Sequence, residues 1–244
     1  MAAIKTVGLT KKYKDVTAVD SLDLEIEEGE LFALLGVNGA GKTTTVKMLS
    51  CLTKPTSGEA AVCGRSVLTE PEKVKEIIDI SMQETAVARK LTVKENVEFY
   101  AKLDGQSREE IKKSLDYVCG VFGLEPVLNR RAGTLSGGWQ RKLSIALALV
   151  SSPKVLFLDE PTLGLDVIAR RELWNAILSL KGKITIILTT HYMEEAESLS
   201  DRIGIMKDGR LLFTGTKEAL FEATGKDSVE DAFVGLVTGG DIRA

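Results

Sequence analysis

The sequence predicts an α/β fold in which a parallel sheet is accompanied by an antiparallel β subdomain and an α-helical subdomain. Three apolar runs of strand length support the parallel sheet: LFALL at 31–35, VLFLD at 155–159 and ITIILTT at 184–190. Strands buried on both faces of a parallel sheet have this nearly continuous apolar composition. A helical pattern follows each run, and such alternation is typical of a parallel sheet covered by helices.

The segments outside these runs divide the chain further. Residues 1–30 and 56–66 alternate apolar with polar side chains, which predicts antiparallel strands. In IGIMKDGRLLFTG, at 203–215, the Asp-Gly pair between two apolar runs predicts a hairpin. Residues 92–151 lack strand patterning and are predicted to form a helical insertion. We therefore expect an α/β core with its antiparallel part at 1–85 and 152–225, a helical subdomain at 86–151, and a short C-terminal helix or tail at 226–244.

Composition argues against several classes of protein. Of the 244 residues, 44% are hydrophobic and 27% charged, as in ordinary soluble globular proteins. The net charge of −3 and the pI of about 5.5 provide no positive field, so we expect no nucleic-acid partner.

Cys51, Cys63 and Cys119 lack metal-binding spacing and are expected to be buried thiols of a reducing compartment. The sequence has no apolar signal region and no apolar stretch of roughly 20 residues, which predicts a cytoplasmic chain that reaches a membrane only through a partner.

A glycine-rich loop follows the first apolar run and precedes a helical pattern. GVNGAGKTT, at 36–44, fits the spacing of a phosphate-binding P-loop. Its glycines let successive backbone N–H groups point at phosphates, Lys42 adds a charge for the β- and γ-phosphates, and the Thr43 hydroxyl is placed for Mg²⁺. A chance glycine-rich turn is the alternative, and the strand–loop–helix context argues against it. The predicted phosphate-contacting residues are Gly36, Asn38, Gly39, Ala40, Gly41, Lys42, Thr43 and Thr44.

Two carboxylates stand at the end of the second apolar run, VLFLDE. A P-loop protein needs an acidic residue at such a strand end to hold Mg²⁺ through water, and Asp159 suits that role. Glu160 is expected to point to the other face, where it can orient an attacking water and accept its proton. The alternative is a solvated Asp-Glu pair, and the presence of a P-loop in the same chain argues against it.

A second glycine pair opens another helical stretch, in LSGGWQRK at 135–142. Backbone N–H groups at a helix start bind anions, so this pair predicts a second phosphate-binding element. The order of P-loop, LSGGWQ, VLFLDE, LGLD and a single histidine resembles the nucleotide-binding subunit of ATP-binding cassette (ABC) transporters over nearly the whole chain. The resemblance implies a RecA-like P-loop NTPase core within a cassette at 1–225 that hydrolyses ATP with Mg²⁺.

In that family two cassettes pack head to tail, and each signature motif closes on the γ-phosphate held by the other's P-loop. The resemblance therefore assigns Ser136, Gly137 and Gly138 to the nucleotide of a second cassette, identical or paralogous. A helix cap with flexible glycines is the plainer interpretation of the same residues.

Four further positions carry over from the family one at a time. Gln83 in ISMQET matches the glutamine loop that senses the γ-phosphate and Mg²⁺, although Glu84 follows it in place of the usual pattern. Asp166 in LGLD matches the D-loop at the dimer interface. His191 matches the switch histidine near the γ-phosphate, although a lone histidine is often structural. Tyr13 matches the aromatic that stacks on adenine, or it is a surface tyrosine near a turn.

The branch of the family is indicated by two further segments. Residues 91–105 and 227–239 look like cassettes of sodium, drug and polysaccharide exporters whose permease is a separate chain. We expect an ATPase on the inner face of the membrane that drives transport, with export favoured, through permease subunits. The alternative is a soluble ABC-type ATPase acting on a non-membrane partner.

The surface that meets the permease is expected after Gln83. The helix at 93–103 places Val93, Val97, Tyr100 and Ala101 toward its own core. Phe99 lies off that stripe, so it is either exposed for docking beside the 84–91 loop or part of a wider core stripe.

Overall fold

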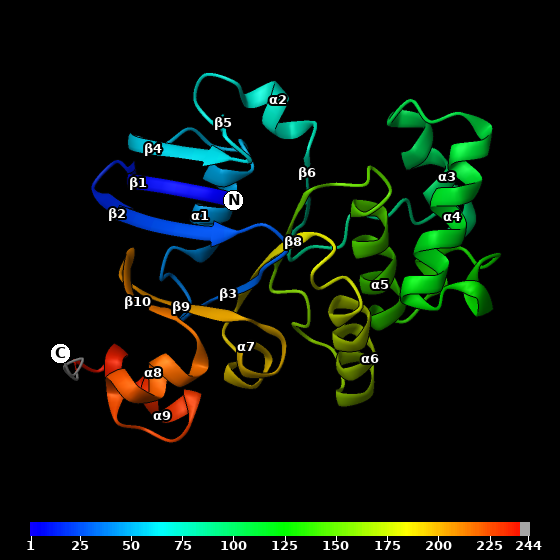
Figure 1. Ribbon diagram of the computed structural model, residues 1–244. Helices are drawn as coiled ribbons and strands as arrows, with labels where there is room; N and C mark the ends of the chain where they lie inside the picture. The colour runs from blue at the N-terminus through cyan, green and yellow to red at the C-terminus, as the bar shows by residue number, and fades with distance from the viewer. Residues whose placement is uncertain (240–244) are drawn as a thin grey trace. The chain divides into compact units, whose positions relative to one another are not determined.

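Two compact units make up the computed structural model, which describes residues 1–239 (Figure 1). One unit combines Met1–Glu76 with the chain from Lys181 onward, and the other comprises Ile77–Leu180. The last five residues of the predicted C-terminal tail, 240–244, lie outside the described residues. The predicted boundaries at 86, 151 and 225 stay a prediction.

An antiparallel sheet occupies the first part of the first unit, as the alternating sequence predicts. Its strands lie in the order β2–β1–β4–β5. Ile4 of β1 faces Ile26 of β2 on one side and Val62 of β4 on the other, and all three are fully buried. The strands are β1 (Ala2–Tyr13), β2 (Val16–Glu27), β4 (Ser57–Val62) and β5 (Arg65–Ser66), and the short helix α2 (Pro71–Lys75) follows them.

The second sheet of this unit is centred on β3 (Leu31–Gly36), which is buried along its whole length. It pairs in parallel with β8 (Thr185–Thr190) and β9 (Arg202–Lys207). The predicted hairpin is confirmed, because β10 (Arg210–Gly215) returns antiparallel to β9. The helices of the unit are α1 (Lys42–Leu49), α7 (Met193–Leu199), α8 (Lys217–Thr224) and α9 (Val229–Val237). Phe233 and Leu236 of α9 pack in one core cluster with Leu35 and Ile203 of the sheet.

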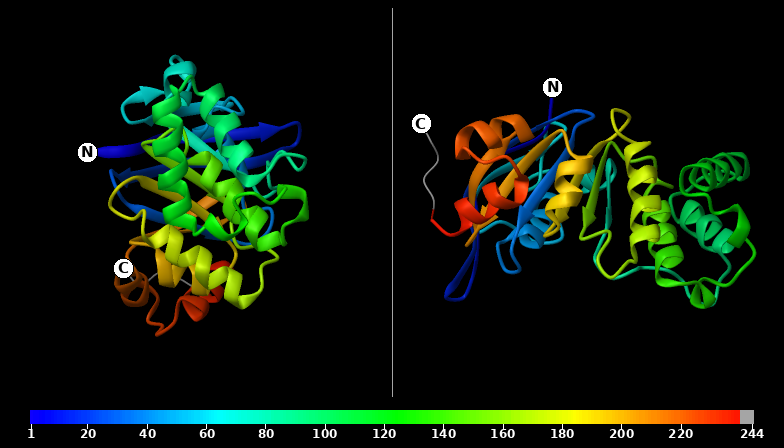
Figure 2. Two further views of the ribbon diagram at one scale, coloured as in Figure 1. Left: turned by 90° about the vertical axis from the view of Figure 1, so that its right-hand side faces the viewer. Right: turned by 90° about the horizontal axis from the view of Figure 1, so that it is seen from below.

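The second unit contains a parallel pair of strands and a group of helices (Figures 1 and 2). Strand β6 (Ile78–Ser81) pairs with β7 (Val155–Asp159), with Ile78 opposite Val155. The sequence did not predict β6, because its four residues are a short apolar run interrupted by Asp79. The helices are α3 (Val93–Leu103), α4 (Arg108–Phe122), α5 (Gly137–Ala148) and α6 (Val167–Leu178), with 3₁₀ turns at Glu125–Val127 and Ala132–Thr134.

Local sequence signals explain where two of these helices begin. The side chains of Thr92 and Ser107 each accept a hydrogen bond from the backbone N–H three residues on, and the carboxylates of Glu95 and Glu110 accept one from the backbone N–H of the cap residue. These reciprocal capping boxes satisfy backbone N–H groups that a helix start leaves unpaired.

The face of α3 predicted to be buried differs from the prediction at one residue. Val93, Val97 and Ala101 are fully buried, whereas Tyr100 is half-buried and its hydroxyl donates to Ala86 O at 3.3 Å. Phe99 is 46% exposed, so it does not widen the core stripe.

The cysteines are also less uniform than predicted. Cys119 is buried, and burial raises the pKa of its thiol to about 11. Cys51 and Cys63 are only half-buried, and each occupies a turn with a positive φ. Thus the expectation of three buried thiols is correct for one of them.

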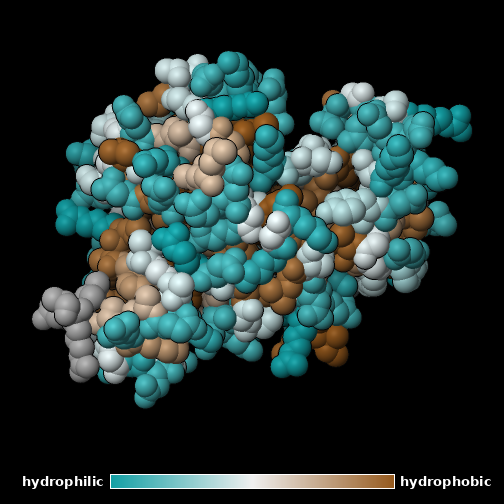
Figure 3. Space-filling model, viewed as in Figure 1, coloured by the Kyte–Doolittle hydropathy of each residue, from teal (hydrophilic) through white to brown (hydrophobic). Residues whose placement is uncertain are grey.

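Hydrophilic side chains cover much of the face seen in Figure 3, with apolar atoms in smaller patches. None of the helices within residues 1–239 combines the length and the apolar character needed to cross a membrane.

Candidate functional site

The P-loop connects the end of β3 to the start of α1. Gly41 caps α1 with a φ of 105°, a left-handed conformation that glycine adopts without strain. A Cβ at Gly41 would lie 2.5 Å from Ala18 O, and one at Gly36 would lie 2.7 Å from Met206 O. Both positions therefore require glycine on steric grounds. Between them, Asn38 and Gly39 are exposed and Ala40 is buried.

The side chain of Lys42, the first residue of α1, folds back onto this loop. Its side chain is buried, and its ammonium group donates to Gly36 O at 2.7 Å and to Val37 O at 3.3 Å. Thr43 and Thr44 occupy the first turn of α1 and are half-buried. A cradle of this kind fits phosphate groups, because backbone N–H groups and a lysine converge at a helix start.

The turn between β9 and β10 is hydrogen-bonded to the P-loop. The N–H of Gly209 donates to Ala40 O at 3.1 Å, and Gly209 O accepts from the N–H of Asp20 at 2.9 Å. Gly209 has a φ of 80°, and a Cβ there would lie 3.0 Å from Ala18 O. The Asp-Gly signal predicted the hairpin, but nothing local in the sequence indicated that its tip contacts the phosphate loop.

Two further predicted residues belong to the same unit as the P-loop. Tyr13 ends β1 and is 46% exposed, with the ammonium group of Lys11 4.9 Å from its ring centroid. His191 directly follows β8 and is half-buried, and its ring centroid lies 4.1 Å from that of Tyr192.

The predicted carboxylates are on the second unit, at the end of β7. Asp159 is 1% exposed and Glu160 is 8% exposed, which excludes the interpretation of a solvated pair. Glu160 also has a φ of 49°. The left-handed region costs a non-glycine residue on the order of 1–2 kcal/mol, and such strain concentrates at functional sites.

Arg141, which the sequence analysis did not single out, contacts the backbone on both sides of Glu160. Its guanidinium donates to Pro161 O at 2.7 Å and to Asp159 O at 2.9 Å. The same group donates to Met82 O at 2.5 Å and to Gln83 O at 3.1 Å. Arg141 thereby joins α5, the end of β6 and the end of β7 within this unit.

The signature residues stand at the start of α5. Ser136 is the N-cap residue, yet its exposed hydroxyl makes no capping hydrogen bond. A Cβ at Gly138 would lie 3.0 Å from Ala169 Cβ of α6, whereas nothing lies within 4 Å of the Cβ position at Gly137. Packing within the chain therefore accounts for Gly138 but not for Gly137.

Asp166 has a local structural role at the start of α6. Its carboxylate accepts hydrogen bonds from the N–H groups of Ile168 and Ala169, both at 2.9 Å. It is therefore the N-cap residue of α6, and its side chain is exposed.

Gln83 is exposed and follows β6. The segment after it is a loop, as predicted, but it is pinned to α3 at two points. Asn96, which is fully buried, accepts from the N–H of Ala88 at 2.8 Å and donates to Ala88 O at 3.1 Å. Tyr100 contacts the same loop at Ala86. These contacts join the loop directly to α3.

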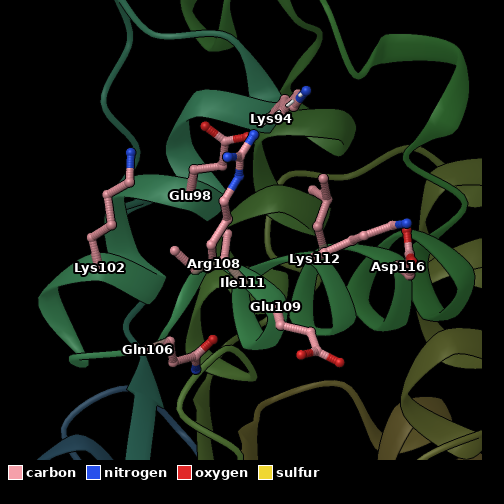
Figure 4. Close-up of a pocket in the computed structure, with 10 residues that line it drawn as sticks. Lys94, Glu98, Lys102, Gln106, Arg108, Glu109, Ile111, Lys112 and Asp116 are labelled. Carbon is pink, nitrogen blue, oxygen red and sulfur yellow. Dashed lines mark ion pairs between the residues drawn. The ribbon is translucent and has the colours of Figure 1, made fainter.

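A cavity of about 1050 Å³ lies on the helical part of this unit, between α3 and α4. Figure 4 shows Lys94 and Glu98 of α3 and Arg108 and Lys112 of α4 along it. Lys94 and Glu98 form an ion pair at 3.8 Å. None of the predicted nucleotide-site residues lines this cavity.

Within residues 1–239, no cluster of three or more His, Cys, Asp or Glu residues could hold a metal ion. The predicted Mg²⁺ ligands Thr43, Gln83 and Asp159 are a different type of donor set. Magnesium sites of this type keep several waters and rely on substrate phosphates for the rest of their ligands. The oxygen donors of the three residues fit that chemistry.

The family model for ABC transporters matches residues 19–163, more than half of the chain. The daunorubicin/doxorubicin resistance ATP-binding protein DrrA of Streptomyces peucetius is 39% identical over 92% of this chain and 68% of its own length. The human phospholipid-transporting ATPase ABCA3 is 42% identical over 92% of this chain, which spans only 13% of that relative's length.

Among solved structures, a dimeric ATP-binding cassette in a post-hydrolysis state with ADP and Pi superposes with a TM-score of 0.79. It is 28% identical, and the match covers 87% of this chain and 98% of that one. The fold is thus that of an ABC ATPase with a P-loop NTPase core, as the motifs predicted. The comparisons fit the transporter subunit rather than the alternative of a soluble assembly ATPase. The chain therefore belongs to the ABC transporter family, in which it is an ATP-binding cassette with ATPase activity.

Proposed function

We propose that this cassette powers an export-type ABC transporter as one member of a head-to-tail pair that acts on a separate membrane permease. The observation that carries the pairing is the exposed start of α5. Ser136 has an uncommitted hydroxyl and Gly137 has open space around its Cβ position. Exposed N–H groups at a helix start, with no side chain in the way, are suited to a phosphate brought by another molecule.

The residues divide the work on ATP by their chemistry. Lys42 and the N–H groups of the P-loop hold the β- and γ-phosphates, and Tyr13 stacks on adenine. Glu160 orients the attacking water and accepts its proton, while Gln83 and His191 contact the γ-phosphate. Thr43, Asp159 and Gln83 would hold Mg²⁺, which neutralises charge on the phosphates. Asp166 lies at the interface of the pair.

The export direction rests on residues 91–105 and 227–239 and on the drug-resistance relative. The permease would place the cassette at the cytoplasmic face of a membrane. For the docking surface we propose α3, where Phe99 is 46% and Leu103 is 71% exposed. These two side chains are four residues apart and share one face of the helix. The pinned 84–91 loop would pass the movement of Gln83 to that face.

The test of the pairing uses Glu160→Gln, which keeps the shape of the side chain but cannot accept a proton. With ATP and Mg²⁺ this variant should bind ATP without cleaving it and elute from gel filtration as a dimer. Ser136→Arg added to it should give a monomer, because the larger side chain blocks closure. Glu222→Arg, at an exposed position on α8, serves as the matched control and should leave the dimer intact.

Lys42→Ala separates failure of the pairing from failure of the nucleotide site. Charge-assisted hydrogen bonds contribute about 1.5–3 kcal/mol each, so this variant should lose roughly 10- to 150-fold in ATP affinity and its ATPase activity. A monomeric Glu160→Gln that still binds ATP would refute the pairing alone. Normal turnover in Lys42→Ala would refute the P-loop assignment.

A further inference from the structure

Arg141 is a buried cation that donates hydrogen bonds to backbone carbonyls beside Glu160 and Gln83. It lies on α5 and is 4% exposed. Its Nε and Nη2 donate to the carbonyls of Pro161 and Asp159, at 2.7 and 2.9 Å. Burial of a guanidinium is costly unless its donors are paired, so these bonds fix where the group lies.

The two carbonyls stand one residue before and one residue after Glu160. Glu160 is held at a φ of 49°, and such a conformation persists only where the surroundings enforce it. A rotation of the peptide units around Glu160 would break one or both hydrogen bonds to the guanidinium. Arg141 therefore clamps the backbone that sets the direction of the Glu160 carboxylate.

Two further donor contacts of Arg141 reach the segment that carries Gln83. Nη1 donates to Met82 O at 2.5 Å and to Gln83 O at 3.1 Å. One planar group thus fixes the glutamine loop, the strand end with Asp159 and the helix that Ser136 opens. A displacement in any of the three strains hydrogen bonds to the other two.

We propose that Arg141 is a positioning residue for ATP hydrolysis, which aims Glu160 and ties the glutamine loop to the signature helix. This inference rests on the proposed roles of Glu160 and Gln83. Only arginine suits the position, because its planar fork presents several donors in fixed directions, whereas a lysine ammonium is a single point on a flexible stem.

The experiment compares Arg141→Lys and Arg141→Met with Lys142→Met. Lys142 is the matched control because it is the next residue on α5 and is also buried. Its ammonium group contacts Glu172 at 2.6 Å and the Trp139 ring at 4.6 Å rather than the carbonyls that flank Glu160. For each variant, kcat and KM for ATP are measured well below the thermal midpoint, together with that midpoint and the affinity for ATP.

Arg141→Lys and Arg141→Met should lower kcat by about 10- to 150-fold, the loss expected from charge-assisted hydrogen bonds. KM and ATP affinity should stay within about twofold, because the loop and lysine that bind phosphate are intact. Lys142→Met should keep kcat within about twofold, because the carbonyls that flank Glu160 keep their hydrogen bonds to Arg141. This separation of kcat from KM is a readout that simple loss of stability would not produce.

Three results would overturn the inference. The first is a kcat within twofold of the parent in Arg141→Lys. The second is a fall in kcat that is accompanied by an equal fold-loss in ATP affinity and by a lower thermal midpoint. The third is failure of both Arg141 variants to fold, which would make the role purely structural. Glu160→Gln, measured in parallel, distinguishes failure of the positioning role of Arg141 from failure of the proposed role of Glu160. If it abolishes hydrolysis while the Arg141 variants keep kcat within about twofold of the parent, only the positioning role fails; if it hydrolyses normally, the role of Glu160 fails as well.

Discussion

At the residue scale, several motif residues have a structural contact within the chain in addition to the role proposed for them at the nucleotide. Asp166 caps α6, Gly138 lets α5 approach Ala169, and Lys42 binds carbonyls of its own loop. Substitutions at these positions therefore alter stability and nucleotide contacts together. Tyr13 and Ser136 are better probes of function, because both are exposed and neither supports the core.

Tyr13→Ala should weaken ATP and GTP binding alike by roughly 5- to 150-fold, because stacking of an aromatic ring on a base contributes about 1–3 kcal/mol and tolerates either base. Tyr13→Trp should be mild. Val16 is opposite Tyr13 across the turn and 65% exposed, so Val16→Ala is the matched control and should bind normally. Equilibrium titration with a fluorescent nucleotide measures all three, and unchanged affinity in Tyr13→Ala would show that the residue is only a surface tyrosine.

At the scale of single elements, β6 holds an acidic side chain in an unfavourable environment. Asp79 accepts hydrogen bonds from the N–H of Ile80 at 2.7 Å and from the Ser151 hydroxyl at 3.1 Å. Burial outweighs these bonds and raises the pKa of Asp79 from 3.8 to about 6, with the nearby Asp104 adding to the effect. At neutral pH the ionised carboxylate therefore destabilises the strand.

The sign of the pH dependence follows from that pKa. The folded protein binds the Asp79 proton more tightly than the unfolded chain does, so this contribution to stability is fully present below about pH 3.8 and is lost as the pH rises through about 6. Asp79→Asn should thus raise the free energy of unfolding near pH 7 by on the order of 2–3 kcal/mol.

That gain should shrink toward pH 4, where the carboxyl is protonated in the folded protein. Urea unfolding of the parent and Asp79→Asn at pH 4.5 and pH 7.5 checks this. Glu84→Gln, at an exposed position in the following loop, is the control. An Asp79→Asn variant with equal effects at both pH values would contradict the raised pKa.

At the scale of the whole molecule, the predicted nucleotide residues are divided between the two units. The P-loop, Tyr13 and His191 belong to the unit that contains β3, whereas Gln83, the signature residues and both carboxylates belong to the other. The unit that contains Gln83, for which we propose contact with the γ-phosphate, also carries α3 and its exposed Phe99. We therefore expect coupling to a permease to depend on this unit while ATP binding depends mainly on the first.

Phe99→Asp should uncouple transport from hydrolysis, because a charge replaces the apolar side chain on the proposed docking face. The ATPase activity of the isolated chain should stay within about twofold, since surface substitutions away from a site have small effects. Tyr117→Asp, at a 43% exposed aromatic on α4, is the matched control and should transport normally.

Transport and ATPase assays of the assembled transporter give this comparison, and cysteines at Val87 and Phe99 add a direct one. Both should cross-link to the permease in membranes. If Phe99→Asp transports normally and neither cysteine cross-links, the docking surface lies elsewhere.

The sequence by itself determined the features that depend on neighbouring residues. Nearly continuous apolar runs specified β3, β7 and β8, because a strand buried on both faces carries mainly apolar side chains. Capping residues specified the starts of α3 and α4, since caps act within three residues. The P-loop, the carboxylates of β7 and the signature were identifiable for the same reason, as each motif fits within a few consecutive residues.

Only the tertiary structure decided which distant segments meet. The bonds of Arg141 join residues 18 and 59 positions away along the chain, and Gly209 supports a loop that precedes it by well over a hundred residues. Strand β6 forms because it pairs with a buried neighbour, not because its four residues favour a strand. Contacts at such separations have no local signature, because they arise when folding brings side chains from separate elements against one another.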